Sequence, residues 1–226
     1  VAVSPDGKYA YVAINGEATV SVIDTAEDKV IKTISVGKNP IGIAVSPDGG
    51  FVYVIYDSHT MDRIDTLTDD IRSFELKIKA YGITVSPDGK YVYVTGIPYA
   101  VSILNTITCK IDIVDVDAEL GGYYIYGAAV SPDGTNVYFS FALGGTLGVI
   151  DAATREITNT GVAVGSSSKG IAVTQDGKYV YVVNEPSGTV TVIDSETYKK
   201  SGEIKVGKNP IALGQFIGKS PIYPPS

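Results

Sequence analysis

VSPDGKYVYVTG, residues 85–96, places two runs of strand-forming residues on either side of a four-residue turn. Pro is favoured at the second position of a type I turn, Asp accepts hydrogen bonds from nearby backbone amides, and Gly tolerates a positive φ. Closely similar stretches recur at residues 3–14, 45–56, 130–141 and 173–184. The sequence therefore predicts a β-hairpin that the chain repeats five times.

The hairpin belongs to a longer repeat. The Ser or Thr that opens the turn stands at residues 4, 46, 86, 131 and 174, so the spacing is 40 to 45 residues. In the first repeat, segments rich in Val, Ile, Thr and Tyr at 1–3, 9–14, 19–24 and 29–36 predict four strands. Strands such as 91–95 are apolar throughout, which predicts burial on both faces. A four-stranded sheet of this length, covered on both faces by its neighbours, is a propeller blade.

We therefore expect an all-β chain that forms one β-propeller over residues 1–217. The expected blades lie at about 1–40, 41–80, 81–125, 126–168 and 169–210. No segment reads as a helix.

The ends of the chain predict how the ring closes. VGKNPI occurs at 36–41 and again at 206–211, and IALGQF (211–216) aligns with IGIAVS (41–46), an innermost strand. We expect 211–216 to join the first blade and close a ring of five blades. The alternative is that blades are missing upstream and the ring has six or seven. Residues 218–226 leave the repeat and are Pro-rich, which is typical of a linker, and they form either a tether to a further domain or a disordered end.

The composition excludes several classes of function. Apolar residues make up 44% and charged residues 19% of the 226, which favours a folded domain with a large core. A net charge of −7 argues against nucleic acid or anionic lipid as a partner, and no apolar run is long enough to span a membrane. The single Cys109 excludes an internal disulfide, and we expect it in an exposed surface turn. The chain opens on Val1 without a visible signal peptide, so we expect that upstream sequence was either cleaved or left out.

The recurring polar residues are best explained by folding. Asp in the first turn and Asp or Asn in the last turn of each repeat accept backbone hydrogen bonds, whereas an active site needs one special position. The lone His59 cannot form a His-rich metal site, and no nucleophile motif or phosphate loop is present. The repeated tyrosines predict core packing. The sequence thus predicts no catalytic residues, no metal site and no cofactor.

One candidate binding surface remains, formed by loops at one end of the propeller. Lysines recur in the blade-to-blade loops of this acidic chain, and tyrosines accompany them. Clustered lysines predict a locally positive potential, and exposed tyrosines stack on sugars or pack against proteins. The candidate ligand is an anionic or glycan-like group or an acidic protein surface. The candidate residues are Lys38, Asn39, His59, Lys79, Tyr81, Tyr99, Tyr123, Tyr124, Lys169 and Lys208.

The repeats also resemble a known family. YVVN (181–184), YVAIN (11–15), the five [ST]-[PQ]-D-G turns, the VID segments and VGKNP together resemble the YVTN-type β-propeller repeats. That family is common in archaeal surface-layer proteins and bacterial extracytoplasmic proteins. The resemblance covers residues 1–216, and residues 55–65 and 119–127 depart from its pattern.

The resemblance implies a non-catalytic scaffold at the cell surface or outside the cell. Such a scaffold binds a protein or glycan partner through one loop face and could self-assemble. Two alternatives stay open: a metal-dependent lactonase- or lyase-like propeller enzyme, and one module of a larger redox or sensor protein. The innermost strands offer almost no His or acidic residues, which counts against the enzyme.

Overall fold

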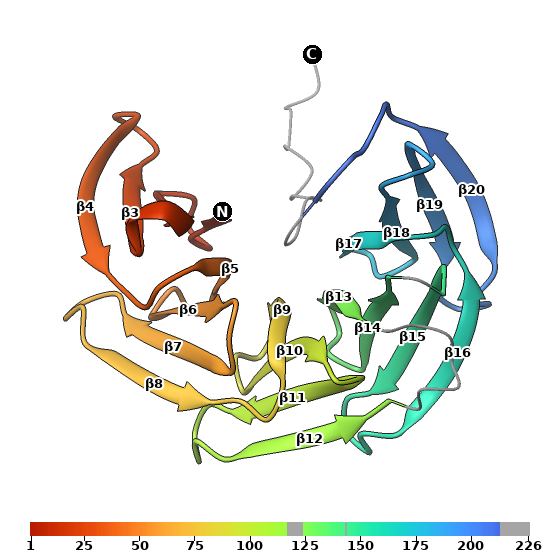
Figure 1. Cartoon of the computed structure of the whole chain (residues 1–226), viewed down its shortest axis with the longest axis horizontal. Helices are drawn as coiled ribbons and strands as arrows, with labels where there is room; N and C mark the ends of the chain where they lie inside the picture. Colours follow the sequence, from red (N-terminus) through yellow and green to blue (C-terminus); the bar gives the residue numbers. More distant parts are fainter. Residues whose placement is uncertain (117–123, 143, 213–226) are drawn as a thin grey trace.

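The fold is an arc of five antiparallel four-stranded sheets, seen in a computed structural model that describes residues 1–116, 124–142 and 144–212 (Figure 1). In each sheet the strand order follows the sequence, from an innermost strand to an outermost strand. The predicted all-β architecture with five sheets is therefore confirmed. We number the sheets blade 1 to blade 5 along the chain.

The strands have the following bounds in each blade. Blade 1 contains β1 (Ala2–Val3), β2 (Tyr9–Ile14), β3 (Thr19–Asp24) and β4 (Lys29–Ser35), with a single 3₁₀ turn, η1 (Asn15–Glu17). Blade 2 contains β5 (Pro40–Val45), β6 (Phe51–Tyr56), β7 (Thr60–Asp65) and β8 (Ile71–Glu75). Blade 3 contains β9 (Lys79–Val85), β10 (Tyr91–Ile97), β11 (Ala100–Asn105) and β12 (Ile111–Asp115). Blade 4 contains β13 (Ile125–Val130), β14 (Asn136–Phe141), β15 (Thr146–Asp151) and β16 (Ile157–Ala163). Blade 5 contains β17 (Ser168–Val173), β18 (Tyr179–Asn184), β19 (Thr189–Asp194) and β20 (Lys200–Lys205).

The turn between the first two strands of each blade is held by one repeated hydrogen-bond network. In blade 3 the Ser86 hydroxyl donates to Asp88 Oδ1 at 2.6 Å and accepts the Tyr91 N–H at 2.9 Å, while the Lys90 N–H donates to Asp88 at 3.0 Å. The same bonds occur in the other four blades. The structural role predicted for the recurrent aspartates is thus confirmed.

Replacing Asp88 should destabilise the protein modestly. Asp88→Ala removes two hydrogen bonds from a surface turn, and we expect the free energy of unfolding to fall by about 0.5–2 kcal/mol, as for the loss of a capping residue. Urea unfolding at pH 7 measures the difference. An unchanged midpoint would count against the role of this carboxylate in the turn.

The same variant should change the response to acid. The Ser86 hydroxyl and the Lys90 N–H lower the pKa of Asp88 to about 2, below its unfolded value of about 3.9. The stabilisation from a lowered carboxyl pKa is complete above the unfolded value and disappears as the pH falls through the folded value. Between pH 4 and pH 2, the Asp88→Ala variant should therefore lose less stability than the unmodified chain, as urea unfolding at each pH would show.

Four apolar clusters hold neighbouring blades together, and they share one pattern. A Tyr of the second strand faces the next blade, where it meets two apolar residues of the following second strand; between blades 2 and 3 these are Tyr53 with Val92 and Val94. Tyr11, Tyr93 and Tyr138 occupy the same position at the other interfaces. We call the side that carries this Tyr the forward face of a blade, and the opposite side its backward face. Burial on both faces, predicted from the sequence, is confirmed in blades 2 to 4.

Blades 1 and 5 stand at the two ends of the arc (Figure 1). Among the described residues, no strand of blade 5 pairs with a strand of blade 1. β1 already fills the innermost position of blade 1. Of the predicted closing strand 211–216, residues 213–216 lie outside the described residues, and Ile211 and Ala212 are not in a strand. Closure of a five-bladed ring by this strand stays a prediction, as does the linker role of residues 218–226, which also lie outside.

Cys109 differs from its prediction. It does lie in the turn between the last two strands of blade 3, but it is half-buried against the cluster between blades 2 and 3 rather than fully exposed. Its backbone adopts φ of 58°, the left-handed position that Asp28, Asp69 and Arg155 take in other blades. In this turn the Cys109 side chain packs toward blade 2. The sequence pattern alone does not reveal this packing. Within the described ranges, no helix could span a membrane.

Candidate functional site at the channel mouth

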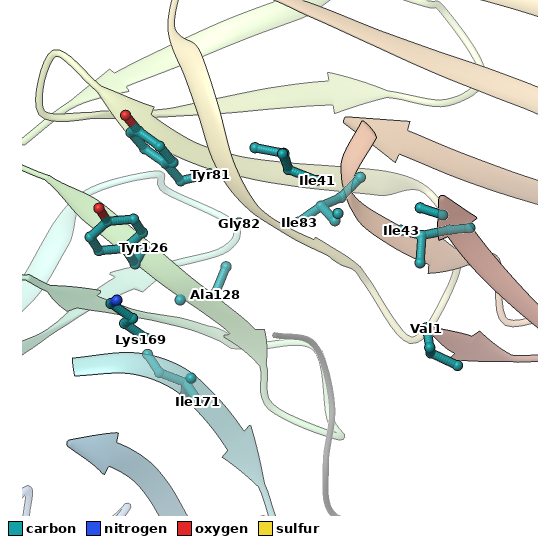
Figure 2. A pocket seen from close by; sticks show the side chains of 14 residues that line it. Val1, Ile41, Ile43, Tyr81, Gly82, Ile83, Tyr126, Ala128, Lys169 and Ile171 are labelled. Carbon is teal, nitrogen blue, oxygen red and sulfur yellow. The ribbon is translucent and has the colours of Figure 1, made fainter. Parts of the chain in front are cut away.

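The blade-to-blade connectors and the turns between second and third strands meet at one end of the arc, because the strands are antiparallel. At this end the innermost strands surround a central channel. Tyr81 on β9, Tyr126 on β13 and Tyr124 immediately before β13 gather there, with Lys79 at the start of β9 and Lys169 on β17. We call these five residues the tyrosine mouth. Figure 2 shows Tyr81, Tyr126 and Lys169 in a row along one side of the pocket, with Ile83 and Ile43 on the other side.

The three tyrosine rings form one cluster. The ring centroids of Tyr81 and Tyr126 are 4.9 Å apart, and Tyr124 lies 6.0 Å from each of them. The Tyr124 ring is edge-on to Tyr81 and nearly parallel to Tyr126. All three side chains are half-buried, so each keeps part of its ring accessible. The cluster presents both ring faces and ring edges, the two kinds of contact that aromatic partners prefer.

Two ion pairs flank the tyrosines. Lys79 Nζ lies 2.6 Å from Asp57 Oδ1 and 5.9 Å from the centre of the Tyr81 ring. Lys169 Nζ lies 2.5 Å from Glu185 Oε2 and 5.9 Å from the centre of the Tyr126 ring. The hydrogen bond to Asp57 raises the pKa of Lys79, so its charge is secure at neutral pH.

These pairs change the electrostatic interpretation. Lysines at the mouth predicted a positive potential, but carboxylates that sequence reasoning did not single out offset Lys79 and Lys169. The mouth is therefore locally balanced in charge, and its aromatic rings dominate what it can contact.

The channel beneath the mouth is narrow. Its cavity measures about 100 Å³ and is lined by apolar residues such as Ile43, Ile83 and Ile171 from successive innermost strands. Glycines at one repeated position bring these strands close together: a Cβ on Gly82 would lie 2.0 Å from the Tyr126 carbonyl oxygen. Pockets for drug-sized ligands usually exceed about 300 Å³. The channel is too small to enclose a substrate of that size.

A larger cavity of about 480 Å³ lies at the opposite end, between the first turns of blades 2 and 3. Its carboxylates, Asp48 and Asp88, accept the hydrogen bonds that hold their own turns. Because the same bonds recur in every blade, these two carboxylates serve the turns. The buried Tyr53 hydroxyl, which also lines the cavity, has no hydrogen-bond partner among the described residues.

The other predicted site residues are scattered around the rim. Lys38, Asn39 and Lys208 are exposed in the connectors, and His59 is exposed in the turn between β6 and β7. No cluster of metal-ligating side chains occurs in the part of the chain that the structure describes.

Two further predicted residues are Tyr99 and Tyr123. Tyr99 is half-buried between β10 and β11, and its carbonyl accepts the Val116 N–H at 2.6 Å. Tyr123 lies outside the described residues. Among the predicted residues, the described contacts bring Lys79, Tyr81, Tyr124 and Lys169 together.

Sequence reasoning missed Tyr126, Asp57 and Glu185. Tyr126 could have been found, because it precedes Gly127 as Tyr81 precedes Gly82. Asp57 and Glu185 directly follow the second strands of blades 2 and 5, yet no sequence signal connects them with the lysines.

Comparison with solved structures supports the fold described above. Hydrazine synthase of Kuenenia stuttgartiensis superposes with a TM-score of 0.77 over 92% of this chain and 74% of that chain, at 20% sequence identity. The chain has a propeller-like fold. Residues 110–208, less than half of the chain, match the family model of the cytochrome D1 heme domain. A search of curated proteins gives no match.

The name of the matched family raises the question of whether this chain could hold a haem. Proteins ligate haem iron through His, Cys, Met or Tyr. The single His59, Met61 and Cys109 all precede the matched segment; Met61 is fully buried and Cys109 lies at the end opposite the mouth. Burial raises the pKa of Tyr81, which disfavours a phenolate ligand. With a channel of about 100 Å³, the described residues do not fit a haem.

Proposed function

We propose that this chain is a non-catalytic binding module of a larger redox-associated protein, and that the tyrosine mouth contacts a protein partner. The redox association is supported by the match of residues 110–208 to a cytochrome haem domain and by the likeness to a hydrazine synthase. The binding role rests on one observation: three clustered tyrosines stand at the mouth of a channel that is too small to enclose a drug-sized ligand.

Several properties of the mouth favour a protein partner. Tyrosine is enriched in the centres of protein interfaces, whereas charged pairs tolerate the partly wet rim. Here the tyrosines stand between Lys79 with Asp57 and Lys169 with Glu185. Because these charges balance, a partner does not need to carry a strong net charge.

The surface scaffold implied by the repeat resemblance is the second candidate. The tyrosine rings could also stack on the faces of a glycan, and this favours a glycan-binding module at the cell surface. The YVTN resemblance and the extracellular location stay predictions. The metal-dependent enzyme receives no support from the described residues, which contain no ligand cluster.

Site-specific photo-crosslinking in the native host tests the proposed function. A benzophenone residue at Lys38, exposed at the mouth end, should cross-link to a protein that carries a redox cofactor. The matched control is the same residue at Leu67, which is 89% exposed in a turn at the opposite end. Tyr126→Ala should reduce the Lys38 cross-link at least fivefold without altering the circular dichroism spectrum.

Three outcomes would contradict this proposal. They are equal cross-linking from Leu67, cross-links that do not depend on Tyr126, and cross-linked proteins without any redox cofactor. Saturable binding of a neutral oligosaccharide that is lost in Tyr126→Ala would instead favour the glycan-binding scaffold.

A further inference from the structure

The two ends of the arc expose blade faces of the kind that are buried elsewhere. At the second-strand position facing the next blade, Tyr53 and Tyr93 are at most 1% exposed, whereas Tyr181 of blade 5 is half-buried. On the opposite face, Val54 of blade 2 is fully buried, whereas the equivalent Val12 of blade 1 is half-buried. One unpaired forward face and one unpaired backward face therefore border the gap (Figure 1).

Apolar side chains extend both faces. Val1 and Val3 are 70% and 55% exposed beside blade 1, and Val206 and Ile211 are 50% and 57% exposed beside blade 5. Apolar side chains exposed on faces that are buried elsewhere in the fold mark these faces as interaction surfaces.

The connector after blade 5 indicates what covers its forward face. After blade 1, the identical VGKNPI segment (36–41) leads into blade 2, where the Gly37 N–H donates to the Tyr56 hydroxyl at 3.1 Å. In the second copy, a Cβ on Gly207 would have no atom within 4 Å.

Beyond this connector, the Ala212 carbonyl oxygen would lie 2.3 Å from a Cβ on Gly170 of β17. The chain thus runs close beside β17, much as β13 runs beside β9 at Gly82, in the position of the innermost strand of a following blade.

We propose that the gap between blades 5 and 1 is filled by one or more further blades of the same repeat, whose backward face covers Tyr181 and whose forward face covers Val12. Such blades remove both exposed faces at once, as closure does in any propeller.

Charge distinguishes such a blade from the blade 5 of a second copy. Where blades 1 and 2 meet, Lys32 of the outer strand pairs with Asp69 in the next blade's last turn, at 2.8 Å. Asp112 and Arg155 form the same pair with reversed charges between blades 3 and 4. In blade 1 the turn position is the exposed Asp28.

At the corresponding outer-strand position, blade 5 has Gly202. At that position it therefore offers Asp28 no charged partner, whereas a blade with Lys or Arg there does. Blade 2 carries such a residue, Arg72.

The test extends the chain. Residues 1–210 are followed by one, two or three copies of residues 41–80, which is blade 2 with Arg72; the identical VGKNPI segments make the junction seamless. For one of these three extended chains we expect a monomer that unfolds in a single transition. Its melting midpoint should be about 10 °C or more above that of the chain of 226 residues. In that variant Val12→Lys should lower the midpoint severalfold more than it does in the chain of 226 residues.

A second set of variants does not depend on the extension. In the unextended chain, Val12→Lys should shift the melting midpoint by no more than about 2 °C, whereas Val54→Lys at the same position of blade 2 should prevent folding. The proposal is wrong if Val12→Lys is as damaging as Val54→Lys, or if every extension unfolds in a separate transition. It is equally wrong if the unextended chain is a dimer that Val12→Lys dissociates, because a second copy is then the occupant.

Discussion

Gly82→Ala should destabilise this protein by about 3 kcal/mol, a large effect for a single added methyl group. A Cβ at this position would lie 2.0 Å from the Tyr126 carbonyl oxygen and 2.5 Å from Thr95 Oγ1. The buried Thr95 hydroxyl donates to that same carbonyl at 3.1 Å. The methyl group must therefore push β13 away from β9 and break this bond between blades.

The loss can be measured by thermal and urea unfolding. For a chain of this size, about 3 kcal/mol corresponds to a fall in the melting midpoint of about 6–12 °C. Gly16→Ala is the matched control, because a Cβ there meets no atom within 4 Å and the backbone is not left-handed. If Gly82→Ala melts like the Gly16 variant, the close approach of β9 and β13 is incorrect, and so is the narrow channel.

Phe139→Ala should cost about 3–5 kcal/mol, the usual range for removing a fully buried aromatic side chain. Phe139 belongs to the cluster between blades 3 and 4. Its ring packs edge-to-face on Phe141, with the ring centroids 5.4 Å apart. It stands directly opposite Gly148 across β14 and β15, where a Cβ would lie 2.2 Å from Phe139 Cζ. The large ring thus occupies the space that the glycine leaves free.

A double-mutant cycle tests this complementarity. Blade 3 has the pair Val94 and Ser102 at the same cross-strand position, so a smaller residue opposite a larger one is compatible with the fold. Phe139→Val and Gly148→Ala should each destabilise, one by a cavity and the other by a clash. The double variant should recover at least about 1 kcal/mol relative to the sum of the two. Additive losses would show that the two residues do not share this space.

Much of the architecture could be predicted from the sequence, because the signals for a blade are local. The Ser86–Asp88 turn, its five repeats and the apolar strands beside it lie within twelve residues each, and they predict hairpins wherever they occur. The alternation of Tyr53 with Val52 and Val54 is local too, although the interface that it forms is not.

The candidate site was predicted less completely, because it depends on side chains from separate blades. Loop composition pointed to Lys79, Tyr81, Tyr124 and Lys169. It did not reveal that Asp57 and Glu185 reach the two lysines, since those distances are set by how blades are rotated against each other. Carboxylates therefore offset the predicted positive potential at Lys79 and Lys169, whereas Lys38 and Lys208 are exposed in the connectors.

By itself the sequence determined the repeat, the five four-stranded sheets and the structural role of the turn aspartates, since each follows from the chemistry of neighbouring residues. Tertiary structure alone decided how far the arc extends, which faces stay exposed at Val12 and Tyr181, and which rings meet at the mouth. The physical reason is that neighbouring blades pack through residues from separate repeats, such as Gly82 against the Tyr126 carbonyl. No local pattern encodes these long-range contacts, which decide how the blades are placed against one another.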